Sequence, residues 1–398
     1  MNQAFAVAAH YSGTWDEARL ERWAVQLRAR LEAPNVTLGL VFLTPQFFEV
    51  ATEVLEILRV HARIPLLLGC SSQSLIANGE ELEDEPGLVV QLFHLPEAAL
   101  RAVHFSDTDL ERTSGPAEWH RFTGVTPGET HGWFIFADPF HLDGESWLRE
   151  WNAAYPGLPS VGGLASGNFE EQRVQLYLNG EVFEDGAVAV SIGGGVKIEC
   201  LTSQGSTPIG APWTITKSDR NFIFQIANRP AYHVLVDTFN ALPKDEQTRA
   251  QGNLFVGFAN SEYHDEFHRG DFLVRNLLGA DPENGILAVG ALPRAGQTIQ
   301  FHRRDAATAT DDLVAGLART RTQVEGATVY GGLLCLCNGR GKRLFGHLGR
   351  PNHDASLVQE QLGPLPVSGF FCNGELGPVG GKNFLHGYTA SLALLVKA

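Results

Sequence analysis

An arginine set between two glycines near the end of the sequence has the residue types that suit small-molecule binding. Arg340 lies between Gly339 and Gly341, directly after the apolar run 330–337. Glycine lets the backbone turn its N–H groups toward a ligand, and the planar guanidinium of arginine matches a carboxylate. We therefore predict that Arg340 and the backbone on either side of it hold the carboxylate of a small ligand.

A second loop supplies the complementary charge. Asn373 and Glu375 follow the apolar run 367–372, and the carboxylate of Glu375 suits an ammonium group. Together the two loops suit a zwitterion such as an amino acid. The sequence leaves one alternative open with equal weight, in which Arg340 and Glu375 pair with each other and only join the two loops.

A pair of glycines earlier in the chain completes the predicted site. Gly162 and Gly163 follow the apolar run 158–161. Short apolar runs bounded by glycine are typical of buried strands, and ligands often meet proteins in the loops beyond such strands. The predicted ligand-binding residues are Gly162, Gly163, Gly339, Arg340, Gly341, Asn373 and Glu375.

Motifs for nucleotides and metals do not fit. A glycine-rich stretch resembles a phosphate-binding loop, but Leu376 stands where its first glycine belongs and Asn383 where its hydroxyl belongs. Cys335 and Cys337 lack the two-residue spacing of a zinc knuckle, and the histidines at the two ends of 264–268 read as part of a polar loop. We predict no cofactor and no bound metal.

The cysteines offer an enzymatic alternative. The chain has five cysteines, all in or beside apolar runs, which indicates reduced thiols rather than a disulfide framework. Cys70 and Cys337 stand at predicted strand ends, where a nucleophile of a hydrolase or transferase could sit. A small thiol packed in the core is the favoured interpretation of Cys70, because no histidine can be paired with it from the sequence. We therefore predict a protein without catalytic activity.

Composition narrows the class of protein. With 398 residues, 44% of them hydrophobic, the chain is long enough for two domains. Its net charge of −15 (30 basic against 45 acidic residues) argues against nucleic acid and anionic membranes as partners. The first residues have no basic segment followed by a long apolar one, and no apolar stretch could span a bilayer. We expect a cytoplasmic protein.

The predicted elements recur in one order. The order strand, helix, strand, loop and strand covers residues 36–95 and 132–192, and it returns over 330–396. Residues 79–93 of the first passage also align with residues 180–192 of the second. The dipeptide Asn179-Gly180 at the start of the latter stretch is a strong signal for a β-hairpin turn. Chance likeness within an α/β chain is the alternative. We predict an α/β fold, with mixed α+β character possible, as two domains (1–225 and 226–398) built from degenerate repeats with mixed sheets.

Several ordered motifs resemble the FIST family, named for F-box and intracellular signal transduction proteins. The resemblance covers nearly the whole chain, as an N-terminal and a C-terminal FIST domain. The motifs that carry it are GGLASG (162–167), DFLVRNLLGADP (271–282), GQTIQFHRRD (296–305), CNGRG (337–341), GFFCNGELGP (369–378) and FLHGYT (384–389).

The resemblance implies a sensory protein that binds a small ligand such as an amino acid. FIST domains occur beside signalling output modules in bacteria and beside an F-box in eukaryotes. The domains leave no room here for an output module, so we expect a separate partner protein to carry the signal. A scaffold for protein interactions without a ligand is a further alternative, which an exposed apolar patch would favour.

Overall fold

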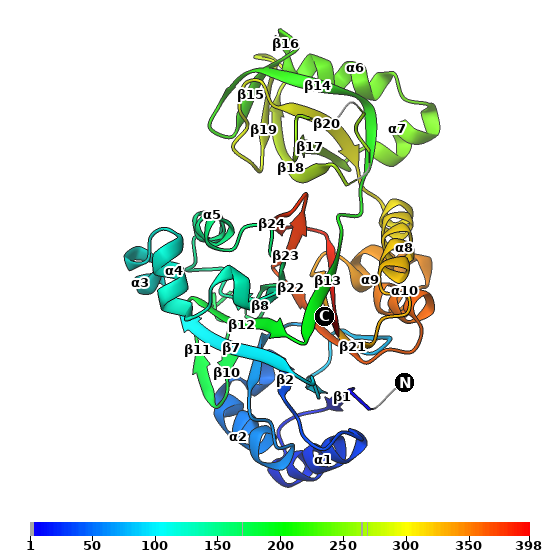
Figure 1. Cartoon of the computed structure of the whole chain (residues 1–398). Helices are drawn as coiled ribbons and strands as arrows, with labels where there is room; N and C mark the ends of the chain where they lie inside the picture. Colours follow the sequence, from blue (N-terminus) through cyan, green and yellow to red (C-terminus); the bar gives the residue numbers. More distant parts are fainter. Residues whose placement is uncertain (1–3, 169, 264–265, 269) are drawn as a thin grey trace. The chain divides into compact units, whose positions relative to one another are not determined.

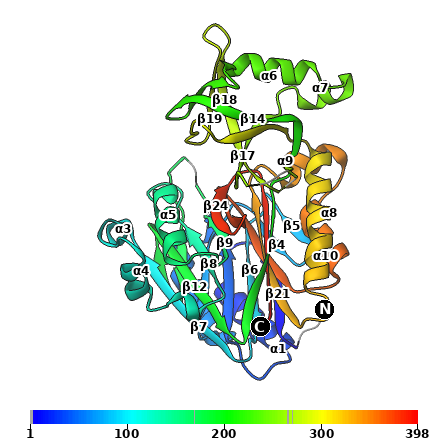
Figure 2. The same ribbon diagram turned by 45° about the horizontal axis from the view of Figure 1, so that its top comes forward.

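A computed structural model describes residues 4–168, 170–263, 266–268 and 270–398. Strands dominate this structure, in three mixed six-stranded sheets and one seven-stranded sheet (Figures 1 and 2). The chain forms two compact units, the first made of residues 1–202 with 313–398 and the second of residues 203–312. The predicted division at residue 225 concerns family domains along the sequence, and it stays a prediction.

The first unit consists of three repeats of one motif. In each repeat, a central strand pairs in parallel with a second strand that follows a helical connection, and in antiparallel with a third strand. In the order central strand, connecting helix, second strand and third strand, the first repeat consists of β2 (Leu38–Leu43), α2 (Ala51–His61), β3 (Leu67–Ser71) and β6 (Gly87–Phe93). The second repeat consists of β8 (Gly132–Ala137), α5 (Gly144–Ala154), β9 (Ser160–Leu164) and β12 (Ala187–Gly194). The third repeat consists of β21 (Val329–Cys337), α10 (His353–Leu362), β22 (Val367–Cys372) and β25 (Ala390–Lys397). The predicted internal repeats are therefore confirmed.

Each repeat lends a hairpin to the sheet of another repeat. The hairpin between the second and third strands leaves its own sheet and adds two strands to a neighbouring one, in cyclic order. The hairpins are β4–β5 (Leu75–Ala77 and Glu80–Leu82) on β22, β10–β11 (Leu176–Leu178 and Glu181–Phe183) on β3, and β23–β24 (Gly374–Val379 and Lys382–His386) on β9. This exchange ties the three repeats into one folded unit.

One glycine in each second strand fixes the register of the parallel pair. Gly69, Gly162 and Gly369 stand opposite Val41, Ile135 and Leu334 of the central strands. A Cβ at any of these glycines would lie 1.7–1.9 Å from the carbonyl oxygen of its partner, so no other residue fits. These glycines therefore provide a numbering by which equivalent positions in the three repeats can be compared.

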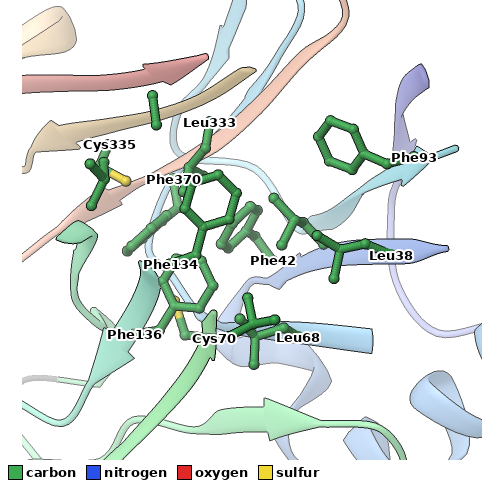
Figure 3. Close-up of a cluster of buried hydrophobic side chains, with 14 of the residues drawn as sticks. Leu38, Phe42, Leu68, Cys70, Phe93, Phe134, Phe136, Leu333, Cys335 and Phe370 are labelled. Carbon is green, nitrogen blue, oxygen red and sulfur yellow. The ribbon is translucent and has the colours of Figure 1, made fainter. Parts of the chain in front are cut away.

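The inner faces of the three sheets meet in a shared apolar core (Figure 3). The ring of Phe42 stacks on that of Phe370 at 4.8 Å between centroids, and Phe136 meets both edge-on. Helices cover the outer faces, namely α1 (Glu17–Arg30) with α2, α4 (Pro116–Thr123) with α5, and α8 (Ala306–Gln323) with α10. The outer strands β1 (Ala6–Ser12), β7 (Ala98–Phe105) and β13 (Val196–Ser203) each pair with a third strand.

The second unit is a closed barrel within the third repeat. Six of its strands close because β14 pairs with both β20 and β15. In chain order its elements are β14 (Thr207–Asp219), β15 (Phe222–Ile226), β16 (Arg229–Pro230), α6 (Ala231–Asn240), α7 (Lys244–Ala250), β17 (Leu254–Ala259), β18 (Phe272–Asp281), β19 (Ile286–Val289) and β20 (Thr298–Arg303). Along the chain, the barrel is inserted between the outer strand and the central strand of the third repeat. At the same point of the sequence, the first repeat has the helix α1 and the second has the helices α3 (Asp107–Arg112) and α4.

These sheets confirm the predicted α/β class with mixed α+β character and mixed sheets. In the part of the chain that the structure describes, no helix combines the length and the apolar character that a membrane crossing needs.

Candidate functional site

The loop after β21 places Arg340 in the interior rather than toward solvent. A tight turn closes when the Arg340 N–H donates to the Cys337 carbonyl at 2.8 Å, just before α9 (Gly341–Phe345). The Arg340 side chain is 0% exposed, and its fork binds both carboxylate oxygens of Asp354 on α10, at 2.6 and 2.9 Å. A third donor reaches the Tyr388 carbonyl at 3.2 Å. In this state, Arg340 joins the loop after β21 to α10.

Asp354 is ionised in this pair. Burial alone acts to raise its pKa, but the charge and hydrogen bonds of Arg340, with help from His353, outweigh burial and hold the pKa at about 2. The His353 ring lies 2.9 Å from Asp354 and stacks on Phe345 at 3.6 Å between centroids. A ligand carboxylate could take the fork of Arg340 only if Asp354 withdrew. The predicted carboxylate-binding role of Arg340 stays a prediction.

Glu375 is a buried acid at the start of β23. It is 0% exposed, and it accepts the backbone N–H of Thr389 at 2.8 Å and the thiol of Cys372 at 3.3 Å. Its register partner on β9 is Gly163, where a Cβ would lie 3.0 Å from the Cys372 sulfur. The structure therefore brings two predicted site residues together at the junction of the second and third repeats.

The equivalent positions show that the fold does not require this acid. Glu375 faces the residue that follows the register glycine, and Leu176 and Leu75 occupy the same place in the other two exchanged hairpins. All three side chains are buried. Because the fold accepts leucine at this place in two of the three repeats, it does not need the carboxylate that Glu375 has in the third.

Glu81 is a second buried acid that departs from the repeats. Its equivalents are Val182 and Leu385, which pack on the helical layers of the other repeats. Glu81 instead accepts hydrogen bonds from the first backbone N–H groups of α10, beside Asp354. Burial and then the charge of Asp354 raise the pKa of Glu81 to about 7.

The core shows the same departure. Phe42 on β2 and Phe136 on β8 each follow the residue that pairs with the register glycine, and Cys335 occupies the same position on β21. Cys335 and Cys372 are both buried in the shared core, close to Glu375. Glu375, Glu81 and Cys335 therefore bring polar side chains to the surroundings of β21 and β22, at positions where the other repeats have leucine, valine and phenylalanine.

Two asparagines, Asn338 directly after β21 and Asn373 directly after β22, form a rim at these strand ends. The Asn338 side chain donates to Asn373 at 2.8 Å, and the Asn373 amide donates to the Ala165 carbonyl at 3.1 Å. Asn373 is exposed, whereas Gly339 is half-buried beneath the ring of Tyr388. The rim therefore offers amide groups and backbone to a ligand from solvent.

Close packing of the backbone accounts for the presence of glycine at several positions of the predicted ligand site. Gly162 and Gly163 lie inside β9 and are buried, not in a loop beyond the strand, so the expected strand end at residue 161 is wrong. Gly341 has a φ of +56°, and a Cβ there would lie 2.6 Å from the Glu83 carboxylate. Their conformations follow from close approach to neighbouring chain segments.

The thiols are poorly suited to nucleophilic attack. Burial raises the pKa of Cys70 well above its usual value, and burial followed by the charge of Glu375 raises that of Cys337 to about 12. Among the described residues, no group of three or more histidine, cysteine and acidic side chains could hold a metal ion. His264, part of the polar loop considered from the sequence, lies outside those residues.

Sequence reasoning missed Asp354 and Glu81. Asp354 had no signal, because it sits at the start of an ordinary helix far from Arg340 in the sequence. A signal for Glu81 existed. The alignment of 79–93 with 180–192 already sets Glu81 against Val182, an acid against an apolar residue.

Comparisons with known proteins cover most of the chain. Family models of the FIST N domain and the FIST C domain match residues 37–229 and 231–378. An uncharacterized protein of Mycobacterium tuberculosis is 35% identical over 375 residues, which are 94% of each chain. An uncharacterized protein of Mycobacterium bovis is 36% identical over 92% of this chain and 91% of its own.

Two remoter similarities add less. An F-box/LRR-repeat protein of Arabidopsis thaliana is 31% identical over 108 residues, which are 26% of this chain and 20% of that protein. The crystal structure of cyanuric acid hydrolase from A. caulinodans aligns with 98% of this chain and 99% of its own, at 10% identity and a TM-score of 0.29. A likeness that low supports no conclusion about fold or activity.

Proposed function

The chain belongs to the FIST family, whose domains are sensory domains of signal transduction, and from this premise we propose that it binds a small, amino-acid-like ligand at the ends of β21 and β22. The protein then passes the signal to a separate partner protein in the cytoplasm. It acts by binding, without catalysis of its own.

One observation supports this location above the rest. The buried acids Glu375 and Glu81 and the thiol of Cys335 lie around β21 and β22, although leucine, valine and phenylalanine occupy the equivalent positions of the other repeats. Burying an ionisable group carries a desolvation penalty, and an apolar replacement of similar volume is often neutral or stabilising. Polar groups that the fold does without elsewhere are therefore candidates for function.

The ligand class follows from the groups at this place. Glu375 lies two residues after Asn373 in the chain and would take the ammonium group of an amino acid. The Asn373 amide and the backbone at Gly339 would meet the rest of the ligand, including its carboxylate. Arg340 holds the loop to α10 through Asp354, or takes the carboxylate itself if Asp354 withdraws.

A thermal-shift screen of the purified protein against the standard amino acids and common metabolites tests this proposal. A ligand at about a hundred times its Kd stabilises the folded state by about 2.7 kcal/mol. The melting temperature is expected to rise for at least one amino-acid-like compound. Asn373→Ala is expected to weaken or abolish that rise, because it removes a rim amide.

Gln73→Ala is the matched control. Gln73 stands four residues after Gly69, as Asn373 stands four residues after Gly369, and it too is exposed and donates to a carbonyl of the second repeat. Its removal is expected to leave the shift unchanged. A screen with no responding compound would contradict the proposal and favour the interaction scaffold. A shift that both variants lose equally would contradict the proposed site, although the protein would still bind a ligand.

A further inference from the structure

A buried carboxylate joins the β4–β5 hairpin of the first repeat to α10 of the third repeat, beside a hydrogen bond that the Ser356 hydroxyl donates to the Gly79 carbonyl at 3.3 Å. Glu81 Oε1 accepts the backbone N–H groups of Asp354 at 2.8 Å and Ala355 at 3.0 Å. In return, the Asn352 side chain accepts the backbone N–H of Glu81 at 2.9 Å. Glu81 is 7% exposed, so these contacts are shielded from water. Glu81 therefore fastens the end of the hairpin to the first turn of the helix.

A second carboxylate stands beside this contact. Asp354 is kept ionised by Arg340, so an ionised Glu81 would bring a second negative charge into the same buried space. Glu81 Oε2 is buried and has no hydrogen-bond partner among the described residues. A proton on Oε2 therefore removes the repulsion without breaking either bond to the helix.

The charged groups that surround Glu81 come from three segments. Those on α10 are Asp354 and His353, those at the start of α9 are Arg340 and Lys342, and those on the hairpin itself are Glu80, Glu83 and Asp84. Arg340 is bound to Asp354, and Lys342 is bound to Asp84. The nearest strong charge that acts on Glu81 is thus the negative one of Asp354.

The sign of the pH dependence follows from these contacts. Burial and Asp354 raise the pKa of Glu81 from 4.5 to about 7 while the contact is made. The contact therefore has its full strength below pH 4.5 and weakens as the pH rises through about 7. Above that pH, Glu81 is charged whether it is attached or released, and the contact stays weak.

We propose that Glu81 is a pH-sensitive latch, which holds the β4–β5 hairpin on α10 when it is protonated and loosens the hairpin when it ionises. Release uncovers the N-terminal turn of α10 beside Arg340 and Asp354. The hairpin belongs to one repeat and the helix to another, so the latch regulates the joint between them. The latch does not depend on which ligand the protein binds.

Hydrogen–deuterium exchange of the full-length protein, without ligand, tests the latch at pH 6 and pH 8. After correction for intrinsic exchange, opening of 80–84 and 353–356 is expected to be about tenfold more frequent at pH 8, given pKa values of 4.5 when released and about 7 when latched. Glu81→Gln cannot ionise, so its opening should be equal at both pH values. Glu80→Gln, an exposed neighbour on the same strand, should keep the tenfold change.

Equal opening of the wild type at both pH values, or a tenfold change that survives in Glu81→Gln, would overturn the latch. If Glu81→Gln does not fold, Glu81→Val replaces it, because valine is the residue that the second repeat has at this position. A ¹³C titration of the Glu81 carboxyl in the wild type gives an independent answer. A midpoint near 7 supports the latch, and a midpoint at an ordinary glutamate value overturns it.

Discussion

At the scale of single residues, the buried ionisable side chains differ in the partners that satisfy them. Arg340 and Asp354 form a two-pronged ion pair that is closed to solvent. Glu375 and Glu81 each use backbone N–H groups as donors instead of an arginine in the contacts described above. The three buried acids thus have different roles. Asp354 holds a loop in place, whereas Glu375 and Glu81 occupy positions at which the other repeats have apolar side chains.

Asp354→Ala is expected to lower the free energy of unfolding by about 3–5 kcal/mol, because it leaves Arg340 buried without its charged partner. Urea-induced unfolding measures this loss. The control is Asp84→Ala, which breaks the exposed pair of Asp84 with Lys342 and should cost no more than about 1 kcal/mol. Similar small losses in both variants would show that the Arg340–Asp354 pair is not needed to hold the loop.

At the scale of elements, the register glycines decide how the parallel strands meet. Gly69, Gly162 and Gly369 approach a partner carbonyl too closely for any side chain. The strand pairs around them position both the exchanged hairpins and the loops of the candidate site. A change at one of these glycines should therefore disturb a whole sheet rather than a single contact.

Gly369→Ala is expected to destabilise the protein by about 3 kcal/mol or more, because its Cβ would lie 1.8 Å from the Leu334 carbonyl oxygen. The midpoint of thermal or urea unfolding reports this loss. Gly387→Ala serves as the control, since nothing lies within 4 Å of a Cβ there. If the two variants melt together, the close approach of β21 and β22 is wrong.

Individual strands and turns were predictable from local sequence patterns, whereas the exchange of hairpins between the sheets was not. The β22 strand matches the apolar run 367–372, and the Asn179-Gly180 turn joins β10 to β11 as the sequence indicated. Hydrophobic runs and turn residues report pairings between neighbours in sequence. They contain no information about a hairpin that leaves for another sheet, so the cyclic exchange and the barrel closure appear only in the structure.

The two neighbouring strand ends were predictable from the sequence, whereas the contacts of the side chains near them were not. The apolar runs ending at Cys337 and Cys372 correctly marked two neighbouring strand ends. Arg340 and Glu375 were expected to face a ligand or each other, and the geometry gives Arg340 the distant Asp354 and Glu375 the backbone of Thr389. Sequence spacing cannot show which helix will pack over a loop, and that packing decides the partner of Arg340.

At the scale of the whole molecule, the three repeats of the first unit provide an internal comparison. Equivalent positions have the same backbone environment, so a difference in side chain reflects a local requirement rather than the fold. Such differences gather around β21 and β22, with Glu375, Glu81 and Cys335 in place of leucine, valine and phenylalanine. We attribute this concentration of polar side chains to ligand binding.

The most direct test of that claim is the stability and ligand response of Glu375→Leu, which gives β23 the residue found at Leu75 and Leu176. Unfolding by urea should show a loss of no more than about 1 kcal/mol, because the desolvation penalty of the buried carboxyl group disappears together with its hydrogen bond to Thr389. The thermal shift seen with amino-acid-like compounds should disappear. A loss of several kcal/mol, or an unchanged shift, would instead make Glu375 a structural residue and contradict the proposed site.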